Sequence, residues 1–108
     1  MSSKVSEFAS KSLDPNDKVL KEYLGQFERK YGTLILSNMR LLFIKEEGFL
    51  KKSYTTTLNL PYKEVKTIVS RGMSLEITDM KDKMYRFVSD LSGSIVENAL
   101  RELMKTPS

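Results

Sequence analysis

The strongest constraint on the fold is a series of short strand-like runs that ends in one amphipathic helix. The runs are rich in apolar or β-branched residues and are separated by turn residues. We expect strands at residues 32–36, 40–45, 54–60, 65–69, 74–78 and 85–88. From Ile95 to Met104 the apolar residues recur instead with the spacing of one helix face. This order predicts a small antiparallel β-barrel or sandwich whose open end or face is covered by the helix.

The segment just before these runs can be interpreted in two ways. Apolar residues at positions 20, 23, 24 and 27 fit a helix, which the local pattern slightly favours. A strand through the same segment would place Lys21 and Gly25 on its apolar face. Residues 1–16 contain few large apolar side chains, so we predict a flexible N-terminal tail there and a domain at residues 17–108.

Two local motifs are expected to define turns and helix ends. Ser37 and Asn38 predict a tight turn in which asparagine tolerates a positive φ. Ser94, with Glu97 three residues later, forms a capping-box pattern. The C-terminal helix is therefore predicted at about residues 93–105.

The composition argues against several classes of chemistry. The chain has 108 residues and contains neither histidine nor cysteine. It therefore lacks the residues most used for zinc binding, thiol chemistry and general-base catalysis near neutral pH. No glycine-rich phosphate loop or nucleophile elbow is present either. We expect one non-catalytic domain, not an enzyme, with no cofactor and no metal.

Charge and hydropathy bear on the partner. The formal net charge of +4 favours anionic partners but does not choose between nucleic acid, membrane and acidic protein. No apolar stretch is long enough to span a bilayer, and the N-terminus has no apolar signal core. We expect a cytoplasmic location with no transmembrane segment.

Residues 31–44 carry a resemblance to a known family. Their sequence resembles the "G-x-L-x-L-T-x-x-R-L-hydrophobic-F" hairpin of the pleckstrin-homology superfamily, in the branch of GRAM, bacterial PH-like and GLUE domains, with Ser37 in place of the usual threonine. Residues 58–68 are similar to the segment that links the fourth and fifth strands of these domains. Residues 74–78 and 85–87 resemble their sixth and seventh strands. The resemblance covers about residues 17–105.

The resemblance implies a fold and a general role. It implies a mainly β, PH-like seven-stranded antiparallel β-barrel or sandwich capped by one C-terminal α-helix, and it assigns residues 18–29 to the first strand. Members of the superfamily are binding modules that engage phosphoinositides, other anionic lipids, ubiquitin or peptides. Because one fold serves all these ligands, the ligand has to be inferred from the site.

In such a barrel, the loops after the first, third and sixth strands gather at the open end. The resemblance therefore gives a set of candidate lipid-binding residues: Arg29, Lys30, Lys45, Phe49, Leu50, Lys51, Lys52, Lys81 and Lys83. Lysines near an anionic leaflet contribute about 1 kcal/mol each, and apolar side chains inserted at the head-group level add to that. The alternative is that Phe49 extends the third strand into the core and that the lysines are solvated turn charges. Exposed side chains at Phe49 and Leu50 would favour the lipid-binding hypothesis, and buried ones would favour the alternative.

Three functions compete at this stage. The first is weak recruitment to anionic phospholipid membranes, as a peripheral membrane protein, through the loops at the open end. The short, weakly basic turn after Arg29 and Lys30 argues against a stereospecific inositol phosphate pocket. The second is a GLUE-type adaptor that binds a protein such as ubiquitin or a sorting-complex partner. The third is nucleic-acid binding, which is not expected because the sequence lacks clustered aromatic residues interleaved with basic residues on one sheet face.

Overall fold

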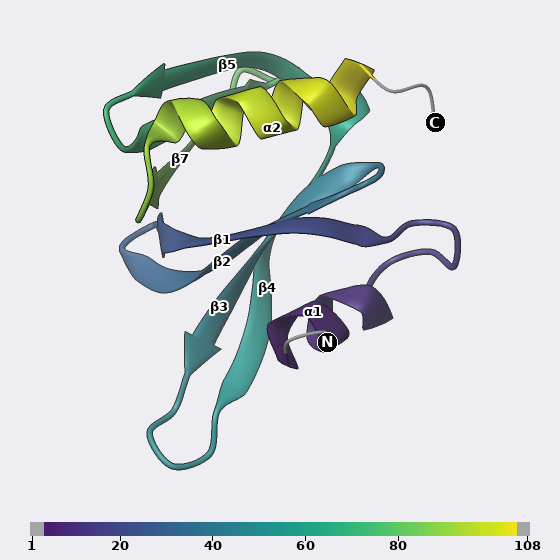
Figure 1. Ribbon diagram of the computed structural model, residues 1–108, viewed down its shortest axis with the longest axis vertical. Helices are drawn as coiled ribbons and strands as arrows, with labels where there is room; N and C mark the ends of the chain where they lie inside the picture. The colour runs from purple at the N-terminus through teal and green to yellow at the C-terminus, as the bar shows by residue number, and fades with distance from the viewer. Residues whose placement is uncertain (1–3, 106–108) are drawn as a thin grey trace.

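The computed structural model describes residues 4–105, which form one antiparallel sheet and two α-helices (Figure 1). The seven strands lie in the order β4-β3-β2-β1-β7-β6-β5. The elements are α1 (Lys4–Lys11), β1 (Val19–Phe27), β2 (Lys30–Ser37), β3 (Arg40–Glu47), β4 (Ser53–Pro61), the 3₁₀ turn η1 (Tyr62–Glu64), β5 (Val65–Arg71), β6 (Ser74–Asp79), β7 (Met84–Ser89) and α2 (Gly93–Lys105). The predicted fold class is confirmed, and the ambiguous first segment is a strand.

The main core lies between the two halves of the bent sheet and α2. Helix α2 packs against β5, β6 and β7, and its Val96 and Leu100 are fully buried. Aromatic side chains fill the centre: the rings of Phe27 and Phe43 have centroids 5.4 Å apart, and those of Phe43 and Phe87 are 6.0 Å apart. This core fixes the sheet whose hairpin ends carry the candidate site residues.

Two glycines lie opposite each other on neighbouring strands of the sheet. Gly25 of β1 pairs with Gly32 of β2. A Cβ atom on Gly25 would lie 2.2 Å from the carbonyl oxygen of Val88 and 2.8 Å from the Phe87 ring. A Cβ atom on Gly32 would lie equally close to a neighbouring carbonyl oxygen and 2.9 Å from the Phe43 ring. Aromatic rings therefore occupy the space that side chains at these positions would need.

The N-terminal segment differs from the predicted flexible tail. Residues Lys4–Lys11 form α1, which packs on the outer face of the sheet formed by β1 to β4 (Figure 1). Ala9 is fully buried there, against Ile35 and Leu42. The ring of Phe8 lies 5.8 Å from that of Tyr54. The helix forms because its few apolar residues fall on one face, and that face covers apolar side chains that would otherwise be exposed.

Two predicted local motifs also need correction. The N-cap of α2 is Ser92 and not Ser94: the Ser92 hydroxyl accepts the backbone N–H of Ser94 at 3.2 Å. The Glu97 side chain accepts hydrogen bonds from Ser70 and Arg101 instead of completing a capping box. Among the described residues, positive φ angles occur at Glu28, Arg29, Asp82, Gly48 and Gly72, so the turn after Ser37 does not use one at Asn38.

The turn between β2 and β3 is organised around a buried carboxylate instead. Oδ2 of Asp17 is 3.1 Å from the Ser37 hydroxyl and 3.4 Å from Nε of Arg40, and Oδ1 accepts the Met39 backbone N–H at 3.2 Å. The Ser37 hydroxyl also accepts the Arg40 backbone N–H at 3.1 Å. A hydroxyl at position 37 therefore closes the turn, which is a physical reason for serine or threonine in the hairpin motif.

Candidate functional site

The hairpin of β3 and β4 extends beyond the body of the molecule. Its tip, residues 48–52, lies at the lower end of Figure 1, at the opposite end of the molecule from α2. Phe49 and Leu50 are each 93% exposed at this tip. The hypothesis that Phe49 extends the third strand into the core is therefore wrong. Two adjacent large apolar side chains at the end of a projecting loop indicate a contact surface.

The shape of the tip depends on Gly48. Its φ of 108° lies in a region that L side chains rarely adopt, and a Cβ atom there would be 2.2 Å from the Lys51 carbonyl oxygen. The chain turns sharply at this point, and Phe49 and Leu50 follow immediately. The glycine therefore sets the direction in which the apolar pair leaves the sheet.

Ion pairs neutralise most of the charge beside the tip. Nζ of Lys45 lies 2.7 Å from Glu47 Oε1, and Nζ of Lys52 lies 2.6 Å from Glu46 Oε1. The hydrogen bond from Lys45 holds the pKa of Glu47 below its usual value, and the hydrogen bond to Glu46 raises the pKa of Lys52. Residues 45–52 contain three lysines and two glutamates, which leaves a net charge of +1.

The turn between β1 and β2 lies near the base of this hairpin. Arg29 has a φ of 65° in the turn, and Lys30 begins β2. Lys45 of β3 pairs with Gly32 of β2, and the charge of Lys30 contributes to the lowered pKa of Glu47. Lys30 and Lys45 therefore both lie near the carboxylate of Glu47.

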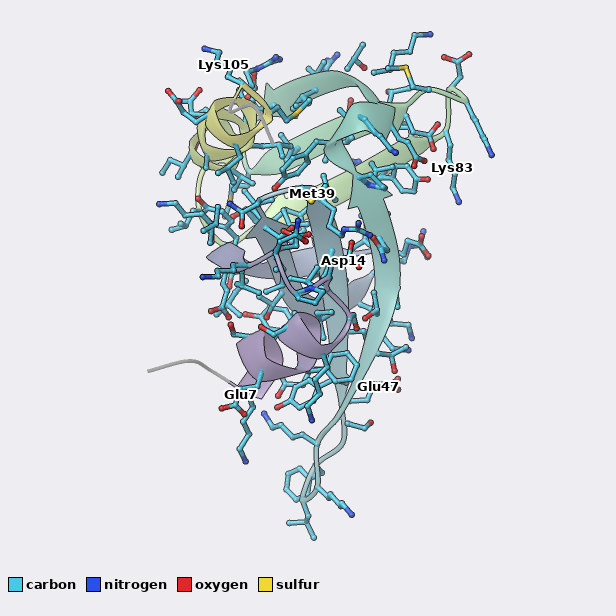
Figure 2. All side chains as sticks on the ribbon, turned by 90° about the vertical axis from the view of Figure 1, so that its right-hand side faces the viewer. Glu7, Asp14, Met39, Glu47, Lys83 and Lys105 are labelled. Atoms are coloured by element: carbon cyan, nitrogen blue, oxygen red, sulfur yellow. The ribbon has the colours of Figure 1, made fainter. Side chains whose placement is uncertain are left out.

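The turn between β6 and β7 lies elsewhere. The backbone N–H groups of Lys81 and Lys83 donate to Asp79 Oδ1 at 2.8 and 3.0 Å, and Nζ of Lys83 lies 5.2 Å from the centre of the Tyr85 ring. Figure 2 shows Lys83 well separated from Glu47 and from the hairpin tip along the long axis. The structure therefore does not bring Lys81 and Lys83 to the same surface as Phe49 and Leu50.

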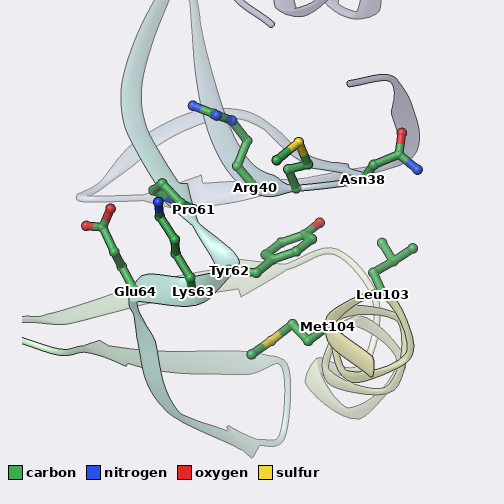
Figure 3. Close-up of a pocket in the computed structure, with 9 residues that line it drawn as sticks. Asn38, Arg40, Pro61, Tyr62, Lys63, Glu64, Leu103 and Met104 are labelled. Atoms are coloured by element: carbon green, nitrogen blue, oxygen red, sulfur yellow. The ribbon is translucent and has the colours of Figure 1, made fainter. Parts of the chain in front are cut away.

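A cavity that sequence reasoning did not find lies at the other end of the sheet. Its volume is about 400 Å³, and Figure 3 shows it between the β2–β3 turn, η1 and the last turn of α2. Its walls include Met39, Tyr62, Leu103 and Met104. The Tyr62 hydroxyl donates to the Ser37 carbonyl oxygen at 2.5 Å, and burial raises the pKa of this phenol. The cavity forms between segments far apart in the sequence, so no local pattern reveals it.

Two further observations bear on the class of protein. None of the helices formed by the described residues is both long and apolar enough to cross a membrane. Within residues 4–105, no three acidic side chains gather at a position that could hold a metal ion.

Comparisons with known proteins identify the fold. No protein-family model matches the chain, and a search of curated proteins also finds no match. Among solved structures, the C-terminal domain of an unknown protein from Leishmania infantum is similar, with a TM-score of 0.69 and 15% identity over 92% of each chain. A pleckstrin homology domain from Shewanella amazonensis matches with a TM-score of 0.64 and 13% identity, over 95% of this chain and 97% of that one.

A DUF1696 family protein with a pleckstrin-homology domain, from Shewanella loihica, matches with a TM-score of 0.63 and 15% identity over 94% of each chain. Identities this low support a conclusion about the fold and not about the ligand. Strand number, strand direction and the C-terminal helix agree with these neighbours. The chain therefore has the pleckstrin-homology fold.

Proposed function

We propose that this chain is a non-catalytic PH-like binding module that is recruited weakly to anionic membrane surfaces through the β3–β4 hairpin tip. The observation that carries the proposal is the 93% exposure of both Phe49 and Leu50 on a projecting loop. Lys51 follows them directly, where a cation would meet lipid head groups. The proposed location is the cytoplasmic face of a membrane.

The energetics favour apolar insertion over charge attraction. Full burial of a leucine or phenylalanine side chain stabilises by about 1.5–3 kcal/mol, whereas a basic residue near an anionic leaflet contributes about 1 kcal/mol. Lys45 and Lys52 are held by glutamates, so the attraction of each for the membrane is opposed by its partner. Binding should therefore be weak, should need the apolar pair, and should depend only modestly on salt.

The narrower assignment is also part of the proposal. The hairpin motif at residues 31–44 supports a place in the GRAM, bacterial PH-like and GLUE branch. A GLUE-type adaptor that binds ubiquitin is the competing function. It predicts binding to a protein that does not depend on Phe49 and Leu50.

Vesicle sedimentation at low salt tests the proposal. The wild type is compared with Phe49→Ala/Leu50→Ala on phosphatidylcholine vesicles with and without phosphatidylserine. Loss of about 1.4 kcal/mol weakens binding tenfold, so the double variant should bind at least about tenfold more weakly. Lys51→Glu should weaken binding only to the vesicles that contain phosphatidylserine.

A matched control removes an apolar pair at the other end of the molecule. Leu91, just before α2, and Ile95, in its first turn, are 50% and 49% exposed, and Leu91→Ala/Ile95→Ala should bind vesicles like the wild type. If the wild type does not sediment with either vesicle, the membrane proposal is abandoned. A titration with ubiquitin, followed by backbone amide shifts, then tests the adaptor function.

A further inference from the structure

Strand β5 forms one end of the sheet. In the order β4-β3-β2-β1-β7-β6-β5, it pairs with β6 on one side, and no other described strand lies on its other side. Such an edge presents unpaired backbone N–H and C=O groups, to which a strand of another chain can add. Val65, Thr67, Ile68 and Val69 are β-branched, which favours strand pairing.

Side chains from α2 occupy this edge. The guanidinium of Arg101 donates to the Ile68 carbonyl oxygen at 2.8 Å. The carboxylate of Glu97 accepts the backbone N–H and the hydroxyl of Ser70, and these bonds, together with the one from Arg101, lower the pKa of Glu97. Nε of Arg101 also lies 2.7 Å from Glu97 Oε2, so the two side chains hold each other in place.

The spacing explains how a helix can bond to a strand edge in this way. Glu97 and Arg101 are four residues apart on the helix, which corresponds to about 6 Å at a rise of about 1.5 Å per residue. Ile68 and Ser70 are two residues apart on the strand, which corresponds to about 6.6 Å. In a strand, alternate residues direct their backbone groups to the same side. The carboxylate of Glu97 can therefore accept from Ser70 while the guanidinium of Arg101 donates to Ile68.

We propose that the Glu97–Arg101 pair closes the free edge of β5 against strand addition by a second copy of this chain. Two identical β5 edges are self-complementary when they run antiparallel about a two-fold axis. An axis at Ile68 would place Lys66 opposite Ser70, so that no like charges face each other. The pair competes with that association because it already uses the backbone groups of Ile68 and Ser70.

The test replaces both residues with alanine, which preserves the helix. Glu97→Ala/Arg101→Ala is compared with the wild type by light scattering after size-exclusion chromatography over a range of concentrations. The variant should approach twice the chain mass of 12.4 kDa as concentration rises, while the wild type stays at one chain mass. At low concentration, the Ser70 amide should exchange with solvent faster in the variant than in the wild type.

A matched control removes an ion pair of the same residue types from the face of the sheet. Nε of Arg71 lies 3.9 Å from Glu76 Oε1, across β5 and β6, and Arg71→Ala/Glu76→Ala should keep the wild-type mass. Adding Ser70→Pro to the Glu97→Ala/Arg101→Ala variant removes the edge N–H and should restore the mass of one chain. If the double alanine variant loses its circular dichroism, the same mass and exchange measurements on Arg101→Ala decide the question.

Two results would overturn the proposal. One is a folded variant that keeps the mass of one chain at every concentration, whatever the exchange rate of its Ser70 amide. The other is a wild type that already associates through β5.

Discussion

Replacing Asp17 with alanine is expected to leave a buried guanidinium without its counter-ion. The Asp17 side chain is fully buried, and its carboxylate lies 3.4 Å from Nε of Arg40. That nitrogen is itself buried and has no hydrogen-bond partner among the described residues, so the carboxylate is the group that balances its charge. The same carboxylate accepts the Ser37 hydroxyl and the Met39 backbone N–H, and each of these donors loses one of its two acceptors.

The magnitude follows from the burial of the two partners. Removing one member of a buried ion pair costs about 3–5 kcal/mol. The Arg40 side chain is 22% exposed, so water relieves part of that cost and the lower end applies. The loss of a hydrogen-bond acceptor for Met39 adds about 1 kcal/mol. We therefore expect Asp17→Ala to lower the free energy of unfolding by about 3–4 kcal/mol, out of about 5–15 kcal/mol for a typical domain.

Urea unfolding followed by circular dichroism measures this change, since the chain has no tryptophan. In a double-mutant cycle with Arg40→Ala, the double variant should lose about 1–3 kcal/mol less than the sum of the single variants. Asp14, which is exposed in the same loop, provides the control, and Asp14→Ala should change stability by no more than about 0.5 kcal/mol. A loss below about 1 kcal/mol for Asp17→Ala, or strict additivity with Arg40→Ala, would refute the reasoning.

Three further predictions concern other parts of the fold. Gly25→Ala should destabilise by at least about 1–3 kcal/mol, because the new Cβ would lie 2.2 Å from a carbonyl oxygen, and urea unfolding measures the loss. Ala9→Asp should release α1, because it places a carboxylate against Ile35, and amide exchange in α1 should rise. Burial raises the pKa of the Tyr62 phenol above its ordinary value of 10.0, so the folded state holds this proton more tightly than the unfolded state does. The stability from this group is complete below pH 10 and is lost as the pH rises further, and Tyr62→Phe should reduce that alkaline loss.

Each of these has a result that would contradict it. Gly72→Ala is the control for Gly25, because no atom lies within 4 Å of a Cβ there, although its φ of 59° adds some strain. Equal losses for the two variants would mean that crowding is not the cause. Unchanged exchange in Ala9→Asp would show that α1 does not depend on its buried face. If Tyr62→Phe loses as much stability at alkaline pH as the wild type does, the loss comes from other tyrosines.

The sequence predicted the strands and α2 because each carries its own pattern of apolar spacing. The first strand was ambiguous because Gly25 seemed to leave a gap on its apolar face. In the structure the Phe87 ring, from a strand about sixty residues later, occupies that space. Helix α1 was missed because its apolar residues are few, and because the sequence does not reveal that the outer sheet face contains Ile35 and Leu42 for them to cover.

For the candidate site, the sequence could indicate composition but not exposure or pairing. The apolar pair at the tip was found because Phe49 and Leu50 interrupt a charged turn. Lys45 and Lys52 form ion pairs with Glu47 and Glu46. These pairs depend on side-chain geometry in the hairpin, which no local sequence pattern indicates. The position of Lys83, away from the tip, depends on how far the β3–β4 hairpin extends from the sheet.

Gly25 and Gly32 each leave room for a neighbouring backbone as well as for an aromatic ring. Gly25 shares one volume with Phe87, and Gly32 shares one with Phe43. The backbone carbonyl oxygens of Val88 and Ile44 lie 2.2 Å from the same Cβ positions, so a smaller residue at Phe87 or Phe43 would not by itself make room for a side chain at its glycine. Substitutions at the two aromatic positions should therefore be tolerated more readily than substitutions at the glycines that face them.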